Sequence, residues 1–143
     1  MLGRMMLKEA DLRETNLSNM SLDYAFFIRC DFNDSTLEAA HFNGAKMGGC
    51  SFNNCKMKDA FFIGADLSHA SLINADLRGA NFNKAFLIGA NLTGASLRGA
   101  NLIDCNLDGA QLAGTDLRGA RLEGAYFGAA DLSGATFDEY PFE

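Results

Sequence analysis

Four cysteines and two histidines are the side chains best suited to metal binding or nucleophilic chemistry, but their spacing matches neither use. Zinc sites are commonly built from two close Cys or His pairs, and a nucleophile needs a base within reach. Cys50 and Cys55 lie close in sequence without a complementary second pair, and His41 and His69 have no fixed partner in the pattern. We expect buried reduced thiols, surface histidines, no metal and no cofactor.

Other catalytic signatures are also missing from the sequence. The glycines form no phosphate-binding loop or nucleophile elbow. Acids such as Asp76 and Asp116 recur in one slot of a repeat, which indicates an architectural role. The sequence therefore favours a protein that is not an enzyme.

A five-residue repeat runs along the whole chain and accounts for these positions. Every position whose number ends in 2 or 7 is Leu, Phe or Met. Two places earlier the residue is mostly Ala, and all four cysteines occupy this small slot. Two places later it is often Gly, as at Gly44 and Gly79. The unit is a small residue, a polar residue, a large apolar residue, a variable residue and a corner.

A period of five fits neither the helical 3.6 nor the strand period of 2, so the chain must turn in every unit. A coil of such units can point its large apolar and small residues inward, with Gly at corners that need positive φ. Neighbouring coils would then pair like parallel strands, about 4.8 Å apart. Each coil would depend on its neighbours for burial.

Stretches such as Ala75–Phe82 and Gly89–Leu102 resemble the pentapeptide repeat family, and the resemblance covers essentially the whole chain. It implies an all-β fold, a right-handed quadrilateral parallel β-helix with four pentapeptides in each coil. Residues 1–143 would form one solenoid domain of about seven four-sided coils.

With four units per coil, inward residues align in columns along the axis. One large apolar column includes Leu22, Phe42 and Phe62, and one small column begins with Met20 and ends with Tyr140. We expect those two bulky residues to plug the ends of the core. Cys30 and Cys50 would be neighbours in a small column, although stacked Cβ atoms are spaced more widely than a disulfide prefers.

Composition limits the possible partners. The 143-residue chain has a formal net charge of −6, which disfavours nonspecific binding to nucleic acid or anionic membranes. No apolar stretch is long enough to span a bilayer, and the first residues do not resemble a signal peptide. We expect a cytoplasmic protein, although an effector exported without a cleavable signal would look the same.

Three features of the outer surface are candidates for recognition. A basic ladder is either paired locally with Asp76 and Asp116 or serves as an anion-binding strip; it consists of Lys58, Arg78, Arg98 and Arg118. An outward apolar set is a candidate partner surface; it consists of Phe26, Ile28, Phe61, Ile63, Phe86 and Ile88. A C-terminal aromatic cluster either dimerises, as the family resemblance implies, or plugs its own core; it consists of Tyr126, Phe127, Phe137, Tyr140 and Phe142.

The sequence favours a protein-interaction or scaffold module whose partner it does not identify. The family resemblance implies an alternative, a homodimer that imitates DNA, binds DNA gyrase and protects it from quinolones. The side that carries Asp11, Glu14, Asp31 and Asp34 is acidic apart from Arg13. A DNA mimic needs a broader acidic surface than this one. Neither interpretation involves direct nucleic-acid binding.

Overall fold

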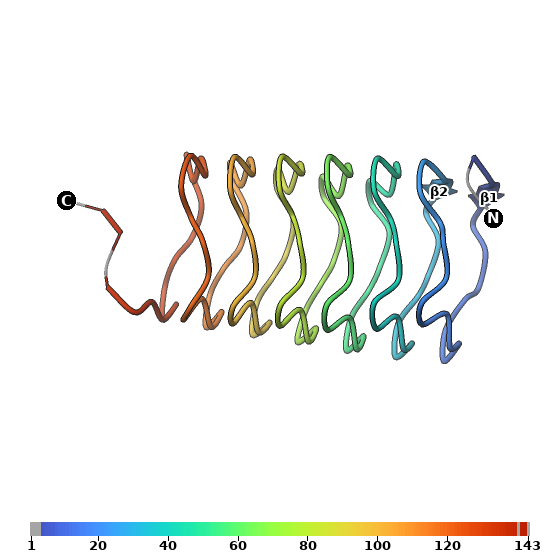
Figure 1. The fold of residues 1–143 in the computed structure, drawn as a ribbon, viewed down its shortest axis with the longest axis horizontal. Coiled ribbons are helices and arrows are strands. Elements are labelled where there is room, and N and C mark those ends of the chain that lie inside the picture. Colours follow the sequence, from blue (N-terminus) through green and yellow to red (C-terminus); the bar gives the residue numbers. More distant parts are fainter. Residues whose placement is uncertain (1–3, 140, 143) are drawn as a thin grey trace.

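The computed structural model describes residues 4–139 and 141–142. Its two named strands, β1 (Met6–Lys8) and β2 (Phe26–Ile28), pair in parallel with Met6 opposite Phe26 (Figure 1). The later coils continue the pairing through isolated parallel bridges. Within the described residues there is no helix, and therefore none with the length and hydropathy of a membrane span.

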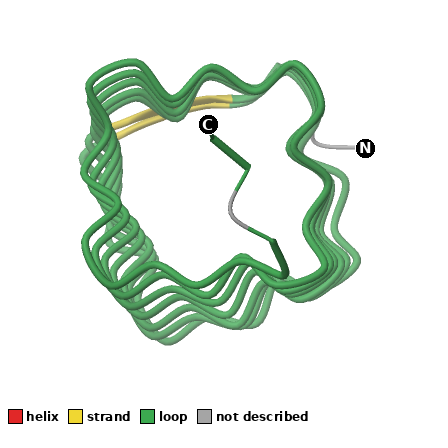
Figure 2. Ribbon diagram, turned by 90° about the vertical axis from the view of Figure 1, so that its left-hand side faces the viewer, coloured by secondary structure: helices red, strands yellow, loops and turns green. Residues whose placement is uncertain are grey.

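Every bridge joins residues 20 positions apart, from Asp11 with Asp31 to Asp116 with Thr136. One coil therefore contains four pentapeptides, and the register does not change along the chain. Seen along the axis, successive coils overlie one another in a roughly square outline (Figure 2). The chain is a β-solenoid in which each coil pairs with the next.

The turn in each pentapeptide comes from a repeated local hydrogen bond. The N–H of the small residue donates to the carbonyl of the central apolar residue three places earlier, as from Ala45 to Phe42 at 3.0 Å. The corner residue between them has a positive φ, 65° at Gly44 and 60° at Asn54. Gly is expected at the corners, but it occupies only some of them. Many non-glycine residues adopt the same positive φ at other corners. The N–H of the corner residue donates to the following coil, as from Asn54 to Ile73 at 2.9 Å, and this bond helps hold the corner against the intrinsic preference for negative φ.

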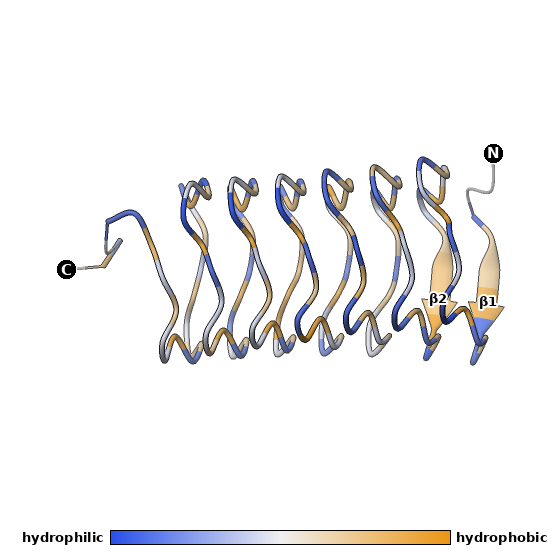
Figure 3. Ribbon diagram, turned by 90° about the horizontal axis from the view of Figure 1, so that it is seen from below, coloured by the Kyte–Doolittle hydropathy of each residue, from blue (hydrophilic) through white to orange (hydrophobic). Residues whose placement is uncertain are grey.

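The interior is formed by the two inward slots of each pentapeptide. The central residues from Leu22 to Leu117 are buried, as are nearly all the small residues between them. Aromatic rings one coil apart stack in parallel: Phe42 and Phe62 lie 5.3 Å apart between ring centroids, and Phe62 and Phe82 lie 4.8 Å apart. The predicted columns are therefore present, and hydrophobic and hydrophilic residues alternate along every coil (Figure 3).

The polar slot before each central residue stabilises the turn. Its side-chain oxygen accepts the N–H two residues ahead, as from Asn83 to Asn81 at 3.0 Å and from Ile103 to Asn101 at 2.9 Å. Asn and Asp favour such turns because their short side chains reach the nearby backbone. This explains why Asp and Asn recur in this slot.

The enclosed small slot predicts that the stability of the fold is sensitive to the volume of the side chain placed there. Ala80 and Ala100 have no solvent-exposed surface, and coils stack directly above and below them. Replacing either with Leu should destabilise the fold by about 1–3 kcal/mol, because a close-packed interior cannot accept the added methylenes without strain. Thermal unfolding followed by circular dichroism measures the effect. Ala129→Leu, at an exposed position, is the control; equal melting temperatures for all three variants would show that the small slot is not tightly enclosed.

Candidate interaction surface

The large apolar side chains most exposed to solvent gather mainly in one column of the solenoid. Within the described residues they are Met6, Tyr24, Phe26, Ile63, Phe86 and Tyr126. Four of them belong to a single run of residues bridged 20 positions apart, which we name the outer column: Met6, Phe26, Lys46, Asp66, Phe86, Asn106 and Tyr126. The column is thus apolar at both ends and in the middle, with polar residues between.

The structure does not bring the predicted apolar set together as one patch. Phe26 and Phe86 share the outer column, but the coils of Lys46 and Asp66 lie between them. At about 4.8 Å per coil, this separates the two rings by roughly 14 Å along the axis. Ile28 and Ile88 lie beside them and are half-buried. The set is therefore at least two separate apolar sites on this side.

Phe61 and Ile63 lie on the neighbouring side of the solenoid, so the set spans two adjacent sides. Phe61 is half-buried, and the ring of His41 stacks on it with centroids 4.4 Å apart. Ile63 remains exposed. His69 belongs to a corner of another coil, where it covers Gly89. The two histidines are therefore separate, as their positions in the repeat predicted.

Met6 and Tyr126 are members of the outer column that sequence reasoning missed. Proximity in sequence associates Tyr126 with the C-terminal aromatics. Its position, 100 residues after Phe26, places it instead in the same column. The signal that could have found it is the 20-residue period itself.

The charge of the basic ladder is largely neutralised by carboxylates on the same side of the solenoid. Arg78 forms a two-bond contact with Asp76, at 2.7 and 2.6 Å, and Arg118 does the same with Asp116. Arg98 approaches Asp116 at 3.9 Å. Hydrogen bonds from Arg78 and Arg118 hold the pKa values of the two carboxyl groups below their usual range. These residues form local ion pairs, and Lys58 is the ladder residue without one in the described structure.

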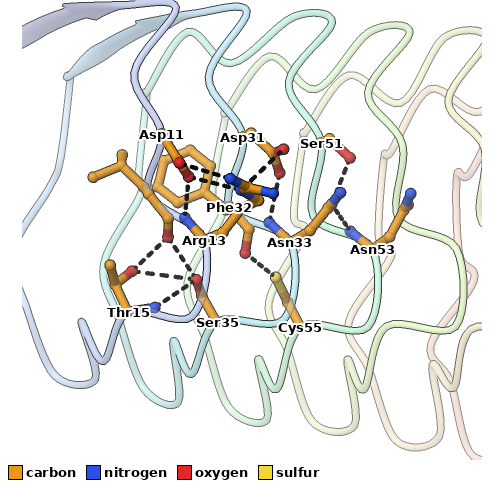
Figure 4. A network of polar contacts seen from close by, with 11 residues as sticks. Asp11, Arg13, Thr15, Asp31, Phe32, Asn33, Ser35, Ser51, Asn53 and Cys55 are labelled. Carbon is orange, nitrogen blue, oxygen red and sulfur yellow. Dashed lines mark hydrogen bonds and ion pairs between the residues drawn. The ribbon is translucent and has the colours of Figure 1, made fainter.

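The acidic side is also partly neutralised. Arg13 donates to both carboxylate oxygens of Asp11, at 2.9 and 2.8 Å, and lies 3.9 Å from Asp31 (Figure 4). The hydrogen bonds from Arg13 lower the pKa of Asp11 to about 2. Asp11, Arg13, Glu14 and Asp34 surround a shallow depression of about 250 Å³. The side is acidic in net charge but carries a central cation.

The C-terminal aromatics divide between the core and the outside. Phe127 is buried, and Phe142 packs edge to face against it with centroids 5.1 Å apart. Phe142 also contacts Phe137, at 6.3 Å. The described segment beyond the last coil leads away along the axis (Figure 1) and, seen along that axis, lies in front of the centre of the outline (Figure 2). Tyr126 points outward instead, and Tyr140 lies outside the described residues.

The repeat model for pentapeptide repeats matches residues 7–38, 37–72, 70–109 and 105–139. The chain belongs to the pentapeptide repeat family. No curated protein matches the sequence.

Several solved structures resemble this pentapeptide repeat protein. A trypsin-treated form of QnrB1, a plasmid-mediated fluoroquinolone resistance protein, is 27% identical over 93% of this chain and 72% of its own, with a TM-score of 0.48. HetL from Nostoc, a pentapeptide repeat protein involved in heterocyst differentiation regulation, is 24% identical over 93% and 89%, with a TM-score of 0.34. A pentapeptide repeat protein of the Arabidopsis thaliana thylakoid lumen is 37% identical over 78% and 71%, with a TM-score of 0.30.

The cysteines are buried in the small slot of this repeat protein. Three of the thiols donate to carbonyls of the preceding coil: Cys30 to Leu7 at 3.4 Å, Cys50 to Phe27 at 3.1 Å and Cys55 to Phe32 at 2.9 Å. Ser35 and Thr115 occupy the same slot, and their hydroxyl groups also donate to carbonyls of the preceding coil. All four cysteines are free. No group of His, Cys, Asp or Glu among the described residues could hold a metal ion.

The burial of the thiols predicts slow reaction with alkylating reagents. Loss of hydration raises the pKa of Cys50 and Cys55 to about 11 and that of Cys105 to about 12, so the reactive thiolate is scarce at pH 8. Folded protein should resist iodoacetamide, whereas protein unfolded in guanidinium should react at all four cysteines. Ser133→Cys, at an exposed position, is the positive control and should react at once. Rapid labelling of native Cys105 would contradict this burial.

Proposed function

We propose that this chain is a non-enzymatic protein-interaction module that acts in the cytoplasm. Its binding surface is carried on a right-handed, four-sided β-helix of about seven coils. The observation that carries the proposal is the outer column, in which Met6, Phe26, Phe86 and Tyr126 hold apolar surface out to solvent.

Such a column suits protein recognition for two physical reasons. Aromatic side chains offer a large contact area with few rotatable bonds, so little conformational entropy is lost on binding. The backbone beneath them is fixed by hydrogen bonds to both adjacent coils, for example from Phe86 N–H to the carbonyl of Ala65 at 2.9 Å and from Leu87 N–H to Asn106 at 2.7 Å. Phe86 and Tyr126 are therefore presented in a prearranged geometry.

Site-specific photocrosslinking tests this proposal. A photoreactive phenylalanine analogue at Phe86 or Tyr126 should crosslink a defined protein partner in the source cells, because these side chains would be covered in the complex. The same analogue at Ser96, a half-buried residue on the opposite side of the four-sided solenoid, is the control. Equal crosslinking from Ser96, or none from either column position, would contradict a binding role for the outer column.

A homodimer through the C-terminal end is part of the proposal. Within the described residues the coil at this end pairs on one side only, and such solenoid edges favour association. Phe127, Phe137 and Phe142 fill the centre of this end, so the contact would use the surrounding rim and the outer surface of the aromatic cluster.

Light scattering tests the dimer. The wild-type protein should have twice the monomer mass, and Phe142→Asp should have the monomer mass, because a charge at the end opposes close contact between two copies. Circular dichroism of the variant shows whether the coils remain folded. A monomeric wild type would contradict the dimer without affecting the outer column.

A second candidate function is gyrase binding, which the carboxylates of Asp11, Glu14 and Asp34 favour. Against it, Arg13 lies among these acids and pairs with Asp11. A supercoiling assay with and without ciprofloxacin separates the candidates. Inhibition or protection at micromolar protein would support gyrase binding, and the absence of both would remove it.

A further inference from the structure

The apolar end of the outer column nearest the N-terminus forms one wall of a surface groove. The groove has a volume of about 440 Å³ and is lined by Arg4, Tyr24, Phe26, Gly44 and Lys46. Tyr24 and Phe26 are 63% and 41% exposed, so both rings are accessible from solvent. Two aromatic side chains and two cations thus surround one open depression.

Gly44 determines where the ring of Tyr24 lies. A Cβ atom on residue 44 would stand 2.6 Å from the Cδ1 and Cε1 atoms of Tyr24, closer than real contacts allow. The ring therefore lies against the glycine corner of the next coil. Gly64, one coil further along the same corner, has nothing within 4 Å of its equivalent position. Within this column of corners, an aromatic ring therefore approaches Gly44 but not Gly64.

The cations of the groove lack partners of opposite charge. Arg13, Arg29, Arg78 and Arg118 each contact a carboxylate, whereas neither Arg4 nor Lys46 forms an ion pair within the described residues. Acids do stand in neighbouring slots, but Asp23 accepts the N–H of Asn43 and Asp66 accepts that of Ser68. In a chain with net charge −6, two unpaired cations beside aromatic rings are notable.

Strand β1 continues the combination of apolar and basic side chains beyond the groove. Met6 pairs with Phe26 and continues its apolar strip, and Lys8 pairs with Ile28 and adds an exposed cation. Lys8 also has no ion pair within the described structure. The groove is therefore one part of an elongated surface with an apolar centre and a basic rim, a shape that suits an extended chain.

We propose that this surface binds an acidic segment of a partner protein. An apolar or aromatic side chain of the segment would lie between Tyr24 and Phe26, and its carboxylates would contact Arg4 and Lys46. Ring contacts and charge-assisted hydrogen bonds complement the two kinds of group present. This inference rests on the proposed interaction function and adds the chemistry of the partner.

A short peptide titration followed by amide NMR tests the inference. The probe is acetyl-Glu-Phe-Glu-amide, and its charge-reversed control is acetyl-Lys-Phe-Lys-amide. We expect the acidic peptide to shift the amide signals of residues 24–26 and 44–46 with a Kd on the order of 1 mM. The basic peptide should leave them unchanged. No shift with the acidic peptide, or equal shifts with both, would overturn the inference.

Matched variants separate the groove from general surface effects. Lys46→Glu and Phe26→Ser should each weaken binding about tenfold. Lys84→Glu and Lys56→Glu change exposed cations that do not line the groove and should leave binding unchanged. Equal loss in the control variants would contradict binding at the groove.

The glycine corner allows a test that leaves every lining side chain in place. Gly44→Asn should weaken peptide binding about tenfold, because its Cβ would displace the ring of Tyr24. The backbone should tolerate Asn, since Asn54 and Asn74 hold φ values of 60° and 57° at equivalent corners. Gly64→Asn is the control and should bind like wild type. Unchanged binding by folded Gly44→Asn would contradict the role of the Tyr24 position.

Phenylacetate distinguishes a peptide from a small aromatic anion. If it binds the groove at least as tightly as the peptide, the assignment to a protein segment is overturned. Photocrosslinking from Phe86 and Tyr126 reports independently on the proposed function. Crosslinks there without peptide binding at the groove would overturn only the acidic-segment inference.

Discussion

Hydrogen bonding between coils at a constant offset of 20 residues is the constraint on which the rest of this structure depends. Each bridge requires the chain to return to the same place after four pentapeptides, so every unit must turn by the same amount. Each of these turns requires a positive φ at the corner residue, as at Gly44 and Asn54. An inserted residue would move all later side chains out of their columns, much as a register slip does in a sheet.

The same offset makes the outer surface a set of columns in which similar positions lie about 4.8 Å apart. A run of like charges is then unfavourable unless carboxylates stand beside it, as Asp76 and Asp116 do beside Arg78 and Arg118. Such exposed pairs contribute little to stability, and their main effect is to remove free charge. Arg4 and Lys46 form no ion pair within the described residues, and they line one groove together with the exposed rings of Tyr24 and Phe26.

Within the described residues, the core is covered differently at the two ends of the solenoid. At the C-terminal end, Phe142 covers the core by packing on Phe127 and Phe137. At the other end, half-buried side chains including Leu7, Leu12 and Met20 surround a small apolar cavity of about 80 Å³. Among the described residues, apolar side chains thus cover the core more completely at the C-terminal end.

The interior could be predicted from the sequence because a strict repeat places every buried residue in one of two slots. Phe42, Phe62 and Ala80 are buried as their positions required. The ion pairing of Arg78 could also be anticipated, since Asp76 is two residues away in the same unit. The local sequence pattern predicts these features because they depend on positions within the five-residue unit.

What the sequence by itself determined is the unit, the inward slots and membership of a column once the coil length is known. The tertiary structure decided which columns expose their side chains and which atoms meet across coils. Phe61 is covered by His41, whereas Phe26 remains open beside Tyr24. The physical reason is that exposure depends on neighbours 20 residues away, and on whether, as at Gly44, a missing Cβ leaves room for a ring.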